Sequence, residues 1–124
     1  MKLEAERRLA KADRFLAQAA ILPSGDVPEA IVHLTYYAML HAAAAVPIER
    51  TGRAPKTHGT IIGQFALLTK DQGDRARSLG RAFNWAEDLR LASDYVTGEV
   101  PSLADVTTIH ATAREFVAYC RSLL

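Results

Sequence analysis

The sequence predicts an all-α fold, an antiparallel, up-and-down helical bundle of four main helices plus one shorter helix. Apolar residues recur at alternating spacings of three and four along most of the chain, which is the period of one helix face. No stretch of useful length alternates apolar and polar residues as a half-buried strand does. Short turns containing proline or glycine separate the periodic segments, so neighbouring helices are expected to run antiparallel.

The first two helices are delimited by turn residues and prolines. The first helix is expected over about residues 2–22, because Pro23 disfavours helical geometry in the residue before it. Asp26 is the expected N-cap of the second helix, since its side chain can accept a hydrogen bond from a free amide of the first turn. Pro47 should kink or end this helix, and residues 50–52 should finish it. Its later half contains the alanines at 42–45, whose small side chains let another helix approach closely.

The remaining helices are predicted from capping residues and apolar periodicity. Thr57 is the expected N-cap of the third, shorter helix, and the fourth helix should cover about residues 75–95. Trp85 lies about a quarter-turn off the apolar stripe of the fourth helix, so it should be partly buried at a rim or an interface. Residues 97–101 should break the chain, and Ser102 should cap the last helix.

Composition and charge narrow the class of protein. The 124 residues are expected to form one domain, residues 1–124, with a single core. Apolar residues make up 49% and charged residues 23%, which is typical of globular proteins and excludes disordered and fibrous classes. The formal net charge of +1 excludes an overall basic field, so any nucleic-acid contact must come from a local cluster of cations.

The expected location is cytoplasmic, with no membrane partner. Cys120 is the only cysteine, so no intrachain disulfide can form, and a reducing compartment is favoured. Cys120 lies on an apolar stripe and is expected in the core. The chain opens with acidic residues rather than a signal peptide, and no apolar run reaches the roughly 18 residues of a membrane span.

The polar connection before the third helix, residues 53–59, carries the strongest functional signal. Arg53 offers a fork of donors suited to phosphate, and His58, five positions later, can exchange a proton near neutral pH. Lys56 adds a second cation, and Thr57 stands where the free amides of a helix start can bind an anion. Arg53 and His58 are therefore candidate catalytic residues, with Lys56 and Thr57 as candidate phosphate-binding residues. The spacing alone leaves open that these are ordinary exposed residues of a loop.

Arg90, Asp94 and Tyr95 form a second polar cluster, at the end of the fourth predicted helix. Arg90 and Asp94 are four positions apart and can pair along the helix, which would be a structural role. Alternatively, the cluster lies beside the loop at 53–59 and supports it. The sequence leaves both interpretations open.

The other histidines do not favour a metal site, and no metal or other cofactor is expected. His33 and His41 lie eight positions apart on the second helix, with Tyr37 between them on the same face. Di-metal bundles use a glutamate three positions before a histidine, whereas Glu29 precedes His33 by four. His110 is expected to be partly exposed.

Three segments of the chain resemble the HEPN family of small prokaryotic helical proteins, most closely its minimal stand-alone branch. They are residues 36–42 (YYAMLHA), residues 56–59 (KTHG), and Arg90 followed by Asp94 and Tyr95. The resemblance extends over about residues 5–122, which is nearly the whole chain.

The resemblance implies a two-fold homodimer with a metal-independent ribonuclease site, made by an arginine and a histidine with four to six residues between them. Arg53 and His58 have this spacing. Many members of the family are toxins encoded beside a minimal nucleotidyltransferase that neutralises them, and others resemble non-catalytic modules that bind a nucleotide or a partner. The chain departs from the toxin pattern at Ala54, often polar in active members, and at Thr60, which replaces a tyrosine that is adenylylated in silenced toxins.

Two hypotheses follow. In the first, the chain is an endoribonuclease in which His58 takes the proton of a ribose 2′-hydroxyl and Arg53 stabilises charge on the phosphate, leaving cyclic phosphate ends. In the second, a dimeric module binds a nucleotide or a nucleotidyltransferase through the same loop without cleavage. A third interpretation, a bundle that only dimerises through the alanine-rich half of its second helix, leaves the spacing of Arg53 and His58 unexplained.

Overall fold

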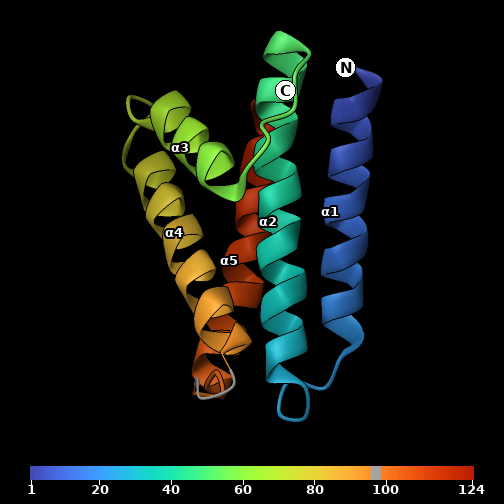
Figure 1. Cartoon of the computed structure of the whole chain (residues 1–124), viewed down its shortest axis with the longest axis vertical. Helices are drawn as coiled ribbons and strands as arrows, with labels where there is room; N and C mark the ends of the chain where they lie inside the picture. The colour runs from blue at the N-terminus through green and yellow to red at the C-terminus, as the bar shows by residue number, and fades with distance from the viewer. Residues whose placement is uncertain (96–98) are drawn as a thin grey trace.

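The computed structural model describes residues 1–95 and 99–124, which form five helices joined by turns (Figure 1). The four long helices run up and down beside one another, and the short helix α3 lies at an angle to them (Figure 1). The predicted all-α bundle is therefore confirmed. The helices are α1 (Leu3–Ile21), α2 (Pro28–Thr51), α3 (His58–Thr69), α4 (Asp74–Asp94) and α5 (Leu103–Ser122).

The central element is α2, which contacts each of the other four helices. By length and composition α2 could cross a membrane, but 78% of its apolar window is buried inside the bundle, as in the core helix of a globular protein. The alanines at 42–45 are at most 2% exposed. Their small side chains are covered within a single chain, so they do not form the exposed dimer face that the third interpretation required.

The prediction that Asp26 caps α2 is wrong, because the helix begins one residue later. Its N-cap is Val27, which makes no side-chain capping bond, and Pro28 is the first helical residue. A proline keeps the residue before it out of the helical region, and Val27 accordingly has φ −133° and ψ 54°. The amide of Asp26 is used instead in a turn, where it donates to the carbonyl of Pro23 at 3.1 Å.

Pro47 does not end α2, because the helix continues to Thr51 and ends within the predicted residues 50–52. Val46, Pro47 and Ile48 are all buried, so packing on this turn offsets the backbone hydrogen bond that proline cannot donate. The helix ends at Gly52, whose φ of 77° lies in the left-handed region that favours glycine, and whose amide donates to the carbonyl of Ile48 at 2.8 Å.

Two predicted N-caps are confirmed. The hydroxyl oxygen of Thr57 accepts a hydrogen bond from the amide of Thr60 at 3.1 Å. The hydroxyl oxygen of Ser102 accepts from the amide of Asp105 at the same distance. Of the predicted break before α5, residues 97 and 98 lie outside the described residues.

The core is centred on phenylalanines from α3, α4 and α5. The ring centroids of Phe65 and Phe83 lie 4.6 and 4.8 Å from that of Phe116. Cys120 is fully buried in the same core, as expected, and burial raises the pKa of its thiol, so it stays an unreactive apolar residue. Trp85 is partly buried against this core, which confirms its predicted place.

The segment between α2 and α3 runs back along α2 rather than away from it (Figure 1). From Tyr36 to Thr51, α2 rises by roughly 22 Å, a distance that about seven extended residues can cover. His58 therefore returns to the level of Tyr36, and the centroids of their rings lie 5.9 Å apart. The direction of this segment determines which side chains meet at the site.

Replacing Ala44 by leucine tests the close packing of α2. Ala44 is fully buried, so Ala44→Leu should lower the free energy of unfolding by about 1–3 kcal/mol through overpacking. Ala17→Leu, at an exposed position of α1, is the matched control and should be nearly neutral. Urea denaturation measures the free energy of unfolding of both variants. Equal values would contradict the close packing around Ala44.

Candidate functional site

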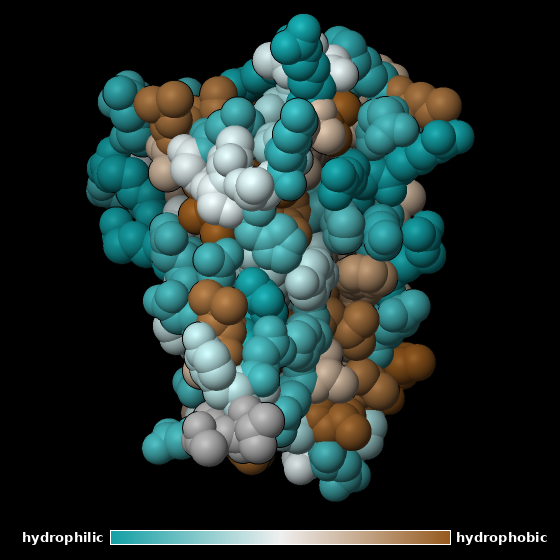
Figure 2. All heavy atoms as spheres, viewed as in Figure 1, coloured by the Kyte–Doolittle hydropathy of each residue, from teal (hydrophilic) through white to brown (hydrophobic). Residues whose placement is uncertain are grey.

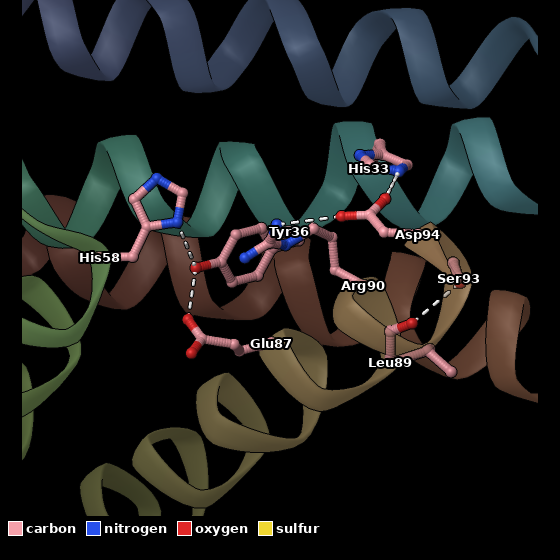
Figure 3. Close-up of polar contacts among 8 residues, drawn as sticks. All are labelled: His33, Tyr36, His58, Glu87, Leu89, Arg90, Ser93 and Asp94. Carbon is pink, nitrogen blue, oxygen red and sulfur yellow. Dashed lines mark hydrogen bonds and ion pairs between the residues drawn. The ribbon is translucent and has the colours of Figure 1, made fainter. Parts of the chain in front are cut away.

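A chain of hydrogen bonds links three helices at the start of α3 (Figure 3). The hydroxyl of Tyr36 on α2 donates to Oε2 of Glu87 on α4 at 2.7 Å. Nδ1 of His58, the first residue of α3, lies 3.3 Å from the same hydroxyl oxygen. The ring of Tyr36 is fully buried, which fixes the hydroxyl between its two partners.

These contacts determine which nitrogen of His58 carries the proton. The Tyr36 hydroxyl has one hydrogen, and the shorter contact, to the Glu87 carboxylate, uses it. The hydroxyl oxygen can then only accept from His58, so Nδ1 of His58 is protonated. Nε2 of the neutral ring is consequently a hydrogen-bond acceptor and a base. Figure 3 shows the other ring nitrogen of His58 turned away from Tyr36.

The environment of Tyr36 keeps its hydroxyl protonated. Burial and the Glu87 carboxylate raise the pKa of Tyr36, while the nearby Arg90 guanidinium opposes this rise. The guanidinium carbon of Arg90 lies 4.9 Å from the centroid of the Tyr36 ring, a cation–π distance. Tyr36 therefore acts as a neutral hydrogen-bonding bridge and not as a titrating group.

Two residues of the second predicted polar cluster, Arg90 and Asp94, lie next to this chain (Figure 3). The guanidinium of Arg90 donates to Oδ2 of Asp94 at 3.1 Å, which confirms the pairing predicted from their spacing. The other oxygen of Asp94 lies 2.7 Å from Nε2 of His33 on α2. Arg90 thus contacts the Tyr36 ring and also pairs with Asp94.

Aromatic rings form the wall of the site. The rings of His33 and Tyr37 are parallel, with centroids 6.4 Å apart. Tyr37 also meets His58 edge to face, at 5.5 Å. His58 is thereby held between Tyr36 and Tyr37 in a partly exposed position.

The predicted residues of the loop at 53–59 lie apart from one another. In the described residues, no hydrogen bond or ion pair joins Arg53 to His58, and the Arg53 side chain lines a pocket between α2 and α3. Lys56 is exposed, and Thr57 caps α3. Tyr95 follows α4 and is 67% exposed. The structure therefore connects His58 to Arg90 and Asp94 only through Tyr36, and it leaves the cations of the loop near the surface.

His41 belongs to a separate contact with α1. A guanidinium nitrogen of Arg8 lies 2.8 Å from Nδ1 of His41, and the ring of Phe15 meets His41 edge to face. Burial, followed by the charges of Arg8 and Lys11 and by His58, lowers the pKa of His41 to about 4. His41 is therefore neutral near neutral pH and accepts its hydrogen bond from Arg8.

The described residues contain no group of three or more His, Cys, Asp or Glu side chains arranged to hold a metal ion. His33 has one acidic neighbour, Asp94, and His41 faces arginine instead. His110 is partly buried on α5.

Sequence reasoning did not identify Tyr36 and Glu87 as site residues. A signal was present on α4, where Glu87, Arg90 and Asp94 follow at spacings of three and four and form a polar stripe beside the apolar one. The partner of Glu87 could not be read from spacing, because Tyr36 lies 51 positions away.

Fold and site together define a small helical-bundle protein in which a histidine at the start of a short helix is oriented by a tyrosine of the central helix. A family model described as the HEPN domain matches residues 5–123, so the chain belongs to the HEPN family. The chain is also similar to "Putative toxin MJ0605" of Methanocaldococcus jannaschii, with 29% identity over 106 residues that cover 86% of this chain and 78% of that protein. The resemblance inferred from the sequence motifs is confirmed.

Protonation of His41 should destabilise the fold. The folded-state pKa is about 4 and the ordinary value is 6.5, so the unfolded chain binds more protons between these values and stability falls as the pH is lowered. The loss is at most about 1.4 kcal/mol for each pH unit in this window. Urea unfolding from neutral pH down to about 4.5 should show a smaller acid loss for His41→Gln than for the wild type. An equal loss of unfolding free energy in both proteins would contradict the lowered pKa of His41.

Proposed function

We propose that the chain is a metal-independent endoribonuclease and the toxin of a toxin–antitoxin pair. The orientation of His58 carries this proposal, because the hydrogen bond to Tyr36 leaves Nε2 as a base on a partly exposed ring. Two cations, Arg53 and Lys56, lie on the same short segment and suit a phosphate backbone. The similarity to a protein named as a toxin supports the biological role. An RNA substrate is consistent with the expected cytoplasmic location, which stays a prediction.

Metal-independent cleavage of RNA needs a base, an acid and a positive charge near the phosphate. Nε2 of His58 accepts the proton of a ribose 2′-hydroxyl, and the 2′-oxygen attacks the adjacent phosphorus. The bond from phosphorus to the 5′-oxygen breaks, and this oxygen takes a proton from an acid. The products are a 2′,3′-cyclic phosphate and a free 5′-hydroxyl. Tyr36, backed by the Glu87 carboxylate, stabilises the imidazolium formed on His58, and Arg53 stabilises charge on the phosphate.

A two-fold dimer would complete the site, as the family resemblance implies. One histidine cannot take the proton of the 2′-hydroxyl and protonate the leaving 5′-oxygen in a single step, so we propose that His58 of the partner subunit donates the second proton. The cations of the loop at 53–59 in each subunit would then face the same RNA strand. Light scattering measures the mass of the protein under assay conditions, and the mass of a monomer would contradict the proposed dimer.

The proposed partner is a minimal nucleotidyltransferase antitoxin that acts by binding. The hydroxyl of Thr60 lies 2.7 Å from that of Thr57 and takes part in the cap of α3, so modification of Thr60 would disturb the start of this helix. We therefore expect mass spectrometry of the chain purified with its partner to find Thr60 unmodified. An adenylyl group on Thr60 would contradict control by binding.

One observation favours the alternative, a dimeric module that binds a nucleotide or a nucleotidyltransferase without cleaving RNA. Arg53 does not contact His58 in the described residues, so one chain does not hold the proposed catalytic pair together. Under this alternative the loop binds anions, and His58 is only a packed side chain. An assay of RNA cleavage at high protein concentration separates the two functions.

Cleavage should depend on His58 and on its orientation. His58→Ala should reduce the rate by about 10²–10⁴-fold, the usual contribution of a general base. Tyr36→Phe keeps the buried ring but removes the hydroxyl, so kcat should fall, KM should change little, and the pH profile should shift. The assay follows labelled RNA in the presence of a chelator and identifies the cyclic phosphate.

His110→Gln on α5 is the matched control and should cleave like the wild type. The proposal fails if His58→Ala, with an unchanged circular dichroism spectrum, cleaves RNA as fast as the wild type.

A further inference from the structure

The positive charge of this nearly neutral chain is concentrated in one part of the fold. Residues 50–86 contain seven Lys and Arg side chains and two Asp side chains, a formal net charge of +5. The rest of the chain contains eight Lys and Arg and twelve Asp and Glu, a formal net charge of −4. Residues 50–86 comprise the end of α2, the connection after it, α3 and much of α4. Such a local concentration of cations suits contact with a polyanion.

A shallow groove runs between α3 and α4, which lie side by side at the left of Figure 1. Its volume is about 240 Å³, below the roughly 300–1,000 Å³ that is usual for sites enclosing a small molecule. Small residues, Ala66 of α3 and Gly80 of α4, are part of its lining. A Cβ atom added to Gly80 would meet only the ring of Phe65, at 3.8 Å. The groove is therefore open and suits an extended chain that lies along the surface.

Both sides of the groove continue to the site at His58. An α-helix turns by about 100° per residue, so His58, Ala66 and Thr69 lie within a quarter-turn of one another on α3. On α4, Asn84 and Glu87 are also less than a quarter-turn apart. Of these residues, Ala66, Thr69 and Asn84 line the groove, whereas His58 and Glu87 belong to the hydrogen-bond chain of the site. The groove and the site therefore share one face of each helix.

Contacts with α4 fix both ends of α3. At its first residue, His58 meets the hydroxyl of Tyr36, which donates to Glu87. At its other end, Nη1 of Arg77 donates to the carbonyl of Lys70 at 3.2 Å. The 12 residues of α3 rise by roughly 18 Å, so a strand that starts at His58 and follows the groove reaches Lys70 after about this distance.

Lys70 and Arg81 are cations of this groove that are available to an anion. Both are exposed, and neither forms an ion pair within the described residues. Arg77 has a structural role instead, because it pairs with Asp74 and donates to the Lys70 carbonyl. Of the lining residues that the structure describes, none is acidic. Figure 2 shows hydrophilic residues along the edge of the molecule where α4 begins.

The lining favours a phosphate backbone over an acidic protein segment. Protein interfaces are anchored by aromatic and other large side chains in well-packed pockets. In the described part of the chain, no aromatic or large apolar side chain lines this groove. Phosphate oxygens are contacted by Arg and Lys and by amides such as that of Asn84. A single strand fits best, because proteins that bind single strands follow one backbone with a positively charged groove.

We infer that the groove between α3 and α4 holds the backbone of single-stranded RNA several nucleotides from the cleaved bond. Lys70 and Arg81 contact its phosphates, so they determine how strongly long strands are preferred to short ones. The position of the cleaved bond at His58 rests on the proposed function, whereas binding of the strand does not require cleavage. A dinucleotide, the shortest RNA with a cleavable bond, is too short to extend from His58 to Lys70.

Fluorescence anisotropy with single-stranded 2′-O-methyl RNA of about 16 nucleotides tests the binding itself, because this RNA lacks the hydroxyl needed for cleavage. Lys70→Gln and Arg81→Gln should each raise its Kd about three- to tenfold, through loss of a charge-assisted contact. Each should also reduce the slope of log K against log salt concentration by about 0.7. Arg114→Gln removes an exposed arginine of α5 outside the groove, so it is the matched control and should bind like the wild type.

Cleavage assays test the length preference separately. The ratio of kcat/KM for RNA of about 16 nucleotides to kcat/KM for a dinucleotide should fall about three- to tenfold in Arg81→Gln and stay unchanged in Arg114→Gln. An unchanged ratio in Arg81→Gln would contradict the role of the groove in length preference. Absence of cleavage in every protein would contradict the proposed function, while the anisotropy measurement would still test the groove.

Either of two binding results would overturn the inference. The first is an RNA Kd that is unchanged in both Lys70→Gln and Arg81→Gln, each with a wild-type circular dichroism spectrum. The second is equally tight binding of a polyglutamate peptide, because the groove would then select negative charge and not the RNA backbone.

Discussion

The site depends on the single proton of the Tyr36 hydroxyl. This proton goes to Glu87 at 2.7 Å, so the oxygen that faces His58 can only accept, and the histidine must carry its own proton on Nδ1. Burial keeps the hydroxyl protonated by raising the pKa of Tyr36. One buried tyrosine thereby links α2, α3 and α4 and determines which nitrogen of His58 is free to accept a proton.

The fold supplies the rigidity that this arrangement needs. Because α2 is covered by all four other helices, Tyr36 is fixed along its whole ring, and Arg90 and Asp94 brace it from α4. The arginines next to His58 in the sequence are placed differently, since Arg50 and Arg53 line a pocket closer to the end of α2. Under the proposed function, proton transfer and anion binding would fall to neighbouring but separate parts of the surface.

Local features of the structure were predictable from the sequence, whereas contacts between distant segments were not. Thr57 and Ser102 cap their helices because capping depends on residues three positions apart, and Arg90 pairs with Asp94 for the same reason. The contact of His58 with Tyr36 depends instead on the connection after α2 turning back along that helix. Spacing also suggested that Arg53 and His58 act together, but it contains no information on where the side chains of a loop point.

The tautomer of His58 shows directly whether Tyr36 orients this ring. Nitrogen chemical shifts of the neutral His58 ring, measured by NMR, report which ring nitrogen carries the proton. If Tyr36 orients the ring, Nδ1 is protonated in the wild type, and Tyr36→Phe shifts the ring toward the Nε2-protonated form. A wild-type ring protonated mainly on Nε2 would contradict it, because Tyr36 would then not hold His58 in the orientation required of a base.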